Sequence, residues 1–466
     1  MKIRLAGLVA VMQVLALSVV AATFYVAEDG SDYNTGTNGW GDALLTIGSA
    51  VSKAANADTI LVSTGTYFVA ADINVTKDLD IRGFSGKPQD TIVNGNFPAT
   101  TNRCFLINHT GAVVSAFTIT NGCAYAGGGG GVRLQAGVVS NCIISGNRAF
   151  ATNTVGIHGG GGVAVESTVY GAIVDSVISG NVTSNGGGGI CSYIPQGYFL
   201  ISNCQVVGNA AITNIYTQSG TGGGIQFGPW GSGYALMTHC LIASNTSSRS
   251  AGGILYGPTY LLSNGVIANC IIRDNATGTG EYGGGVFMSV GTLRNCLVSG
   301  NTAGRGGGVY MSGAATGNKM LQNCTVVGNT NATHGGGVSI ISGANPYLQN
   351  CIVWGNTGPA GASNVSVEAT STAVSFSNCC TAGGATVAAA LINQYSTNNL
   401  SVDPGLAADY RLAKGSHCVN AGANQSWMRE AGGVDLDGRQ RLDRFSRLVD
   451  MGCYEYVSEG MMLSIH

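Results

Sequence analysis

The chain contains 466 residues, carries a net charge of −2 and has only 9% charged residues. A chain this poor in charge lacks the basic surface that nucleic acid or anionic lipid requires, so we expect no nucleic-acid partner. Glycine is abundant at 74 residues and proline is scarce at 8, which fits neither collagen nor a disordered linker and indicates a repeat with glycine at fixed places.

Residues 1–22 have the features of a secretory signal peptide. Two basic residues precede an apolar run from Leu5 to Val20, and Ala21 and Ala22 supply the small residues of a cleavage site. A membrane anchor is the alternative, but the run is shorter than about 20 residues and its flank is cleavable. We therefore expect a secreted or cell-surface protein that has no membrane span after signal cleavage.

Residues 23–100 are predicted to hold the N-terminal cap and the first coils of a solenoid. Leu44, Ile47 and Val51 lie at helical spacing within residues 44–57, which predicts a short amphipathic helix, and a strand is expected at residues 59–62. Since a solenoid must cover the apolar end of its core, we interpret the helix as an N-terminal cap.

Residues 101–400 contain a heptapeptide, Asn-Cys-x-aliphatic-x-Gly-Asn, that recurs about every 30 residues, as expected for one solenoid coil per repeat. Its copies span residues 141–147, 175–181, 203–209, 239–245, 269–275, 295–301, 323–329 and 350–356, and a ninth begins at Asn378. Between the copies lie glycine runs followed by an apolar-x-apolar triplet, such as Val286-Phe287-Met288, which is the pattern of a strand with one buried face. The alternation predicts an all-β fold, a single-stranded right-handed parallel β-helix with a short N-terminal capping helix.

The last Asn of each heptapeptide falls at the same corner of successive coils. Aligned amides can hydrogen-bond along the stack, and Asn tolerates the left-handed conformation of a tight corner. We predict a structural asparagine ladder rather than a column of ligand-binding amides, because a corner amide that satisfies buried backbone groups needs no ligand. The ladder comprises Asn147, Asn181, Asn209, Asn245, Asn275, Asn301, Asn329 and Asn356.

Fourteen cysteines would normally indicate disulfides in an exported protein. Most of them share one heptapeptide position, where the stacking distance of about 4.8 Å exceeds the usual Cβ separation in a disulfide of about 3.8 Å. We therefore expect a column of buried free thiols, with paired disulfides as the alternative. Pairing is left open for Cys379, Cys380, Cys418 and Cys453. No metal site is predicted, because no Cys-x-x-Cys occurs.

The start of the mature chain resembles known β-helix proteins. Phe24–Val26 with Asp29–Asp32, then the predicted helix, then Ile60–Val62 and Gly65–Tyr67, looks like the entry to the pectate-lyase superfamily. This resemblance implies the same β-helical architecture. The resemblance does not imply a particular activity, because fold does not imply function and these families mix enzymes, adhesins and proteins of unknown role.

Residues 401–456 are similar to the C-terminal module of bacterial choice-of-anchor β-helix proteins. The similarity rests on Asp403–Leu406, Tyr410–Leu412, Asp435–Gly438 and Asp450–Glu455. It implies a C-terminal capping module in an exported bacterial protein. The tail, residues 457–466, shows no recognisable sorting signal, so the sequence leaves the means of surface anchoring open.

Acidic residues are scarce in the predicted coils. Enzymes that cleave polysaccharides on this fold need carboxylates, which hold Ca²⁺ in lyases or act in pairs in hydrolases. Between residues 120 and 400 no two acids share a repeat position in adjacent coils. The acids there are Glu166, Asp175, Asp274, Glu281 and Glu368.

One polar group of residues precedes the glycine runs of three consecutive coils. Tyr282, Arg305 and His334 occupy this position, and Glu281 is adjacent to the first of them. Stacking is expected to bring them together, so these four residues are the candidates for a catalytic acid–base site or a sugar-binding patch. The alternative is a solvated edge with a local ion pair.

Two functions fit the sequence. A rigid rod that displays Thr, Ser, Asn, Tyr and Gln side chains suits non-catalytic adhesion or glycan binding, with an extracellular polysaccharide or cell-surface glycan as partner. The alternative is a carbohydrate-active enzyme, either a polysaccharide lyase or a glycoside hydrolase. We favour the first function because the coils lack acids. No cofactor is expected, and Ca²⁺ would be needed only if the protein is a lyase.

Overall fold

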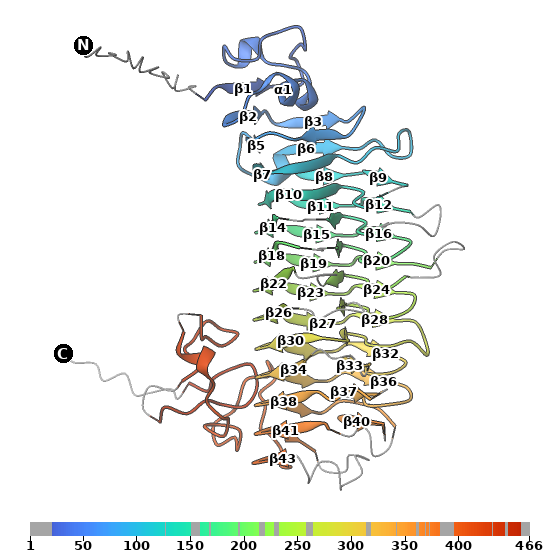
Figure 1. The fold of residues 1–466 in the computed structure, drawn as a ribbon, viewed down its shortest axis with the longest axis vertical. Helices are drawn as coiled ribbons and strands as arrows, with labels where there is room; N and C mark the ends of the chain where they lie inside the picture. The colour runs from blue at the N-terminus through green and yellow to red at the C-terminus, as the bar shows by residue number, and fades with distance from the viewer. Residues whose placement is uncertain are drawn as a thin grey trace, which may run out of the picture.

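The computed structural model describes residues 21–457, apart from residues 126, 151–158, 167–168, 194–195, 214–219, 228–232, 258–263, 314–317, 342, 360–362, 369, 372, 383–395, 431 and 443–445. These residues form a parallel β-solenoid whose coils stack below the N-terminal helix α1 (Ile47–Lys53), as Figure 1 shows. The predicted signal peptide, except its last two residues, and the tail beyond residue 457 lie outside the described residues.

A complete coil contributes four short strands, and these stack into four columns, which we number in chain order from the glycine run. Columns I and II share one 23-stranded sheet, and the long strands β7 (Phe105–Ser115) and β10 (Val132–Ser140) pass through both. Column I further contains β4 (Ile73–Val75), β13 (Val163–Val165), β17 (Ile190–Ser192), β21 (Ile225–Phe227), β25 (Ile254–Tyr256), β29 (Val286–Met288), β33 (Val309–Met311), β37 (Val338–Ile340) and β40 (Val365–Val367). Column II further contains β1 (Thr23–Val26), β2 (Asp58–Val62), β5 (Leu79–Gly83), β14 (Tyr170–Val174), β18 (Tyr198–Ser202), β22 (Tyr234–Thr238), β26 (Asn264–Ala268), β30 (Gly291–Arg294), β34 (Lys319–Gln322), β38 (Tyr347–Gln349), β41 (Ser375–Ser377) and β43 (Ser396–Thr397).

Columns III and IV form the other two sheets. Column III is a twelve-stranded sheet of β3 (Gly65–Phe68), β6 (Thr91–Asn94), β8 (Thr118–Thr120), β11 (Ile143–Ser145), β15 (Val177–Ser179), β19 (Gln205–Val207), β23 (Leu241–Ala243), β27 (Ile271–Arg273), β31 (Leu297–Ser299), β35 (Thr325–Val327), β39 (Ile352–Trp354) and β42 (Cys380–Thr381). Column IV is an eight-stranded sheet of β9 (Cys123–Ala124), β12 (Arg148–Ala149), β16 (Val182–Thr183), β20 (Ala210–Ala211), β24 (Thr246–Ser247), β28 (Ala276–Thr277), β32 (Thr302–Ala303) and β36 (Thr330–Asn331). Neighbouring coils pair in parallel in every column, which confirms the predicted all-β solenoid.

The apolar alternation read in the sequence decides which side chains fill the solenoid. In β29, Val286 and Met288 are fully buried and point inward, whereas Phe287 between them lies on the outer face. In β27, Ile272 is fully buried and Arg273 is exposed. Strands of this kind give one face to the core and leave the other face for solvent or a ligand. In β33 and β37, by contrast, all three residues are buried.

The corners differ in one respect from our prediction. We expected the last Asn of the heptapeptide to take the left-handed conformation, but none of the eight ladder residues has a positive φ. In the copy that ends at Asn301, the positive φ values belong to the first residue, Asn295 (57°), and to Gly300 (65°). The prediction was wrong because the residue before the ladder makes the turn, which explains the Gly at that position in most copies.

The ladder amides bond to one another through the core. The Nδ2 atom of Asn301 donates to the Oδ1 atom of Asn329 at 2.9 Å and to the backbone oxygen of Ile272 at 3.0 Å. The Oδ1 atom of Asn301 accepts from the backbone N–H and the Nδ2 atom of Asn275 at 3.0 and 2.9 Å. The same side-chain contact links each ladder residue to the next from Asn147 to Asn356.

The glycine runs and the asparagine ladder meet inside the solenoid. A Cβ atom on Gly285 would lie 2.7 Å from the backbone oxygen of Gly308 and 2.9 Å from the Nδ2 atom of Asn301. Gly131 and Gly337 lie equally close to ladder amides in their own coils. The two motifs therefore depend on each other, because an amide buried against the backbone leaves no room for a side chain.

Helix α1 covers the N-terminal end of the core. Its N-cap Thr46 accepts a hydrogen bond from the backbone N–H of Ser49 at 3.1 Å, and Ile47 and Val51 are buried on its inner face. The ammonium group of Lys77 donates to helix carbonyls at the other end, which neutralises the C-terminal end of the helix dipole. The predicted helix is confirmed, and it is shorter than residues 44–57.

Residues beyond 400 turn back and pack beside the last coils, as the red segment in Figure 1 shows. The backbone N–H of Gly452 donates to the oxygen of Asn350 at 2.7 Å, and Leu412, Cys418 and Met451 pack against Ile352 of β39. The segment predicted to be a capping module therefore covers the outer face of column III near its C-terminal end.

All fourteen cysteines are buried free thiols, as predicted for the repeated column. The four cysteines left open in the sequence are free as well. Cys418 packs in one apolar cluster with Cys380, and Cys453 packs in another with Leu297. The thiols therefore act as small apolar side chains.

Candidate functional site

Three of the predicted site residues lie together on the outer side of column I. Tyr282 and Arg305 pair across neighbouring coils, and the Arg305 guanidinium carbon lies 5.4 Å from the centroid of the Tyr282 ring, which is a cation–π distance. His334 occupies the same place in the next coil, where its Nδ1 atom lies 2.9 Å from the hydroxyl of Thr333. Stacking therefore brings Tyr282, Arg305 and His334 together as expected.

We call the group of Tyr282, Arg305 and His334 the patch. Sequence reasoning missed two aromatic residues beside it. The Tyr310 ring centroid lies 4.9 Å from that of Tyr282 and 5.1 Å from that of Phe287. Tyr310 and Phe287 are the middle residues of apolar-x-apolar triplets and lie on the outer side of their strands, where Phe287 is half-buried and Tyr310 is only 2% exposed. An aromatic residue at that triplet position was the signal that could have revealed them.

The electrostatics of the patch favour a neutral imidazole beside a fixed cation. Partial burial lowers the pKa of His334, and the Arg305 charge lowers it further, whereas Glu368 opposes both effects. Burial raises the pKa of Tyr310, so its phenol stays protonated. The patch thus holds a neutral base, a guanidinium group and a carboxylate.

The predicted Glu281 joins this patch through its backbone. Its carbonyl oxygen accepts from the backbone N–H of Arg305 at 2.8 Å. Glu368 is the carboxylate whose charge acts on both His334 and Tyr310. In the part of the chain that the structure describes, no three His, Cys, Asp or Glu side chains are arranged to hold a metal ion.

Two ion pairs lie on column I nearer the N-terminus. The Nη1 atom of Arg103 lies 3.0 Å from Asp72, and the Nη2 atom of Arg133 lies 2.5 Å from Glu166. A Cβ atom on Gly127 would lie within 3.3 Å of both guanidinium groups, so the two arginines are neighbours. Glu166 seemed isolated in the sequence, because its partner comes from the preceding coil.

Three tyrosines form a row on the outer face of column II. Tyr170, Tyr198 and Tyr234 pair in register as the first residues of β14, β18 and β22. Successive ring centroids are 6.0 and 5.6 Å apart, and the ring planes differ by only 3° and 10°. The outer two tyrosines are 36% and 37% exposed. We call this arrangement the tyrosine row.

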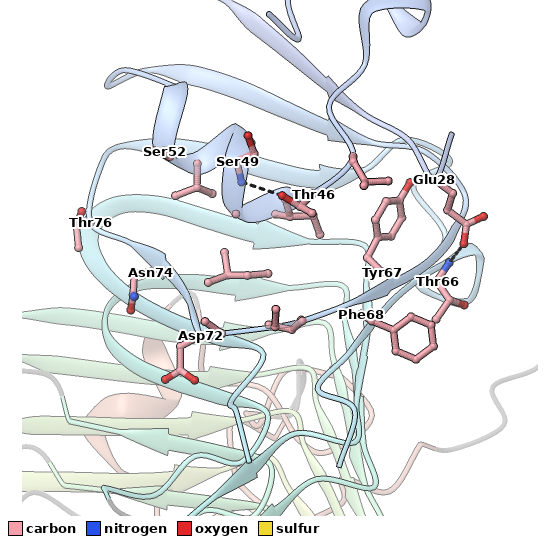
Figure 2. A pocket seen from close by; sticks show the side chains of 18 of the residues that line it. Glu28, Thr46, Ser49, Ser52, Thr66, Tyr67, Phe68, Asp72, Asn74 and Thr76 are labelled. Carbon is pink, nitrogen blue, oxygen red and sulfur yellow. Dashed lines mark hydrogen bonds between the residues drawn. The ribbon is translucent and has the colours of Figure 1, made fainter. Parts of the chain in front are cut away.

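A cavity of about 860 Å³ opens between α1 and the segment that leads from β3 to β4. Figure 2 shows the helix residues Ser49 and Ser52 on one wall and Phe68, Asp72 and Asn74 on the other. We call it the cap cavity. Sequence reasoning missed it, because residues far apart in the chain form its walls.

The repeat and its stacked columns define the class of this protein, a right-handed parallel β-helix. The family model described as a right handed beta helix region matches residues 157–326. No protein of curated function matches the chain by sequence.

Solved structures of three other proteins are similar in fold to this chain over most of their length. The structure of XylC with xylose has 11% identity and a TM-score of 0.53, and the match covers 94% of this chain and 99% of that one. Pectate lyase Pel9A has 15% identity and a TM-score of 0.44 over 94% and 98% of the two chains. A rhamnogalacturonan lyase has 11% identity and a TM-score of 0.38 over 77% and 87%. At such identities the likeness shows the fold alone, and the resemblance of residues 401–456 to a choice-of-anchor module stays a prediction.

No described residues build a helix that is both long and apolar enough to cross a membrane.

Proposed function

We propose that this protein is an exported glycan-binding rod that holds an extracellular polysaccharide or cell-surface glycan along its side. The observation that carries the proposal is the tyrosine row, in which Tyr170, Tyr198 and Tyr234 present partly exposed rings from three successive coils. Aromatic side chains suit sugars because a phenol combines apolar contact area with a hydrogen-bonding hydroxyl.

The spacing of the tyrosine row favours a ligand that itself repeats. Coils stack about 4.8 Å apart, so identical side chains recur along the rod at a constant step. Leu200 and Leu236 form a partly exposed apolar row beside the tyrosines and extend the contact surface. Weak contacts to successive sugars then add up, because each contact raises the effective concentration of the next.

Two further points support a sugar as the ligand. Partial burial and the neighbouring tyrosines raise the pKa of Tyr198, so its hydroxyl stays protonated and able to donate. A β-helix of similar fold, XylC, has been determined with xylose.

The test is retention of the mature protein on a panel of insoluble neutral and acidic polysaccharides. We expect Tyr198→Ala to weaken retention about fivefold, since one aromatic contact is worth about 1 kcal/mol. Tyr33→Ala is the matched control, because Tyr33 is fully exposed outside the row. Equal retention of Tyr198→Ala and wild type on every polymer would refute the proposal.

A second candidate function, a polysaccharide lyase or glycoside hydrolase, is favoured by the patch around His334. A neutral imidazole beside Arg305 could remove a proton from a sugar whose carboxylate pairs with the guanidinium. The test is product release from the same polysaccharides, with Ca²⁺ and with chelator, followed by unsaturated-uronate absorbance and reducing ends.

The variant His334→Ala should abolish this release. His239→Asn should not, because His239 takes the place of the first Asn of the heptapeptide in its own coil. Absence of product from wild type under all conditions would exclude the enzyme on those substrates.

A further inference from the structure

We propose that the cap cavity is a second binding site, which takes a neutral oligosaccharide of a few sugar units. Residues 28–77 build it, whereas the tyrosine row belongs to residues 170–234, so the two sites are separate. Its volume of about 860 Å³ falls within the range of about 300–1,000 Å³ that is typical of small-molecule sites.

The charged groups around the cavity are already engaged by the protein. Glu28 accepts from the backbone N–H of Thr66 at 2.7 Å, and Asp72 pairs with Arg103 at 3.0 Å. Lys77 donates to the backbone oxygens of Val51 and Ser52 at 3.0 Å each. An ionic ligand would lose hydration without gaining a partner, so the cavity favours a neutral ligand.

The remaining lining combines apolar surface with free hydroxyl and amide groups. Phe68 is 63% exposed, and Leu45 is exposed as well. The side chains of Ser49, Ser52, Asn74 and Thr76 line the cavity and have no hydrogen-bond partner among the described residues. This mixture matches a pyranose, which has apolar C–H faces and a rim of hydroxyl groups.

The rigid surroundings of the cavity favour binding with little loss of entropy. The N-cap bond from Ser49 to Thr46 and the three hydrogen bonds of Lys77 hold both ends of α1. Asp32 accepts from the backbone N–H groups of Leu45 and Thr46 at 3.0 and 2.9 Å, which fixes the segment before the helix. Such a wall is already formed before the ligand arrives.

The experiment is isothermal titration calorimetry of the mature protein with xylotriose, cellotriose and trigalacturonate. We expect at least one neutral trisaccharide to bind about tenfold more tightly than the charged one, and Phe68→Ala to weaken that binding about fivefold. Phe84→Ala is the matched control, because Phe84 is 59% exposed in the same part of the chain and does not line the cavity.

The inference would be overturned by no binding of either neutral trisaccharide, by unchanged binding to Phe68→Ala, or by tighter binding of trigalacturonate. Competition by a simple alkyl detergent with no sugar would also overturn it, since the cavity would then be a site for apolar chains. Retention of Phe68→Ala on polysaccharide separates this result from failure of the proposed function, because retention depends on the tyrosine row.

Discussion

Replacing one rung of the asparagine ladder tests how the coils are held together. Asn301→Leu removes an amide that is fully buried in the middle of the ladder. Without it, the backbone N–H of Asn275 and the backbone oxygen of Ile272 lose the partners they have at 3.0 Å. A buried polar group left unpaired costs about 1–3 kcal/mol, so the variant should lose about 2–6 kcal/mol of unfolding free energy.

The assay is guanidinium-induced unfolding followed by circular dichroism, with the transition midpoint and slope compared. Thr302→Leu is the matched control, because the adjacent Thr302 is exposed on β32 and receives the same side chain. We expect the control to stay within about 0.5 kcal/mol of wild type. If Asn301→Leu unfolds at the same midpoint as Thr302→Leu, the ladder does not stabilise the solenoid.

Three further predictions follow from packing and charge. Gly285→Ala should destabilise the coils by about 1–3 kcal/mol through overpacking, because its Cβ would lie 2.7 Å from a backbone oxygen. Gly48 lies on α1, where an added Cβ atom would meet open space, so Gly48→Ala should instead raise the unfolding free energy by about 0.5–1 kcal/mol. Equal unfolding midpoints of Gly285→Ala and Gly48→Ala would contradict this contrast. Burial raises the pKa of Glu455 to about 8, so its pairing with the buried Arg441 guanidinium at 3.1 Å is tested at pH 9, where Arg441→Leu should cost about 3–5 kcal/mol. Limited proteolysis of the variant should then cut residues 401–457 first, and an unchanged cleavage pattern would argue against the pair. Burial raises the pKa of Cys142 from 9.0 to about 12, so the stability from this thiol is complete below pH 9 and falls by up to about 1.4 kcal/mol per pH unit as the pH rises from 9 towards 12. Cys142→Ser should make the alkaline loss of stability shallower, and parallel unfolding curves of the two proteins against pH would refute it.

The sequence by itself determined the repeating part of this protein. The heptapeptide and the glycine runs fixed the coil length, the alternation of buried and outward residues, and the column of thiols, because each follows from local periodicity. The N-terminal helix could be predicted from the sequence for the same reason, since its apolar residues recur at helical spacing. Even Tyr282, Arg305 and His334 could be grouped, because they share one repeat position in consecutive coils.

The tertiary structure alone decided which outward side chains become neighbours where they share no position of the repeat motifs. Tyr170, Tyr198 and Tyr234 lie at unequal sequence spacings, because the segments between columns differ in length from coil to coil. Only the hydrogen-bond register of column II aligns them, just as the register of column I joins Arg133 to Glu166. The cap cavity depends in the same way on how α1 packs over the first coil. Periodicity therefore predicts the core, whereas the surface sites depend on the lengths and packing of segments that do not repeat.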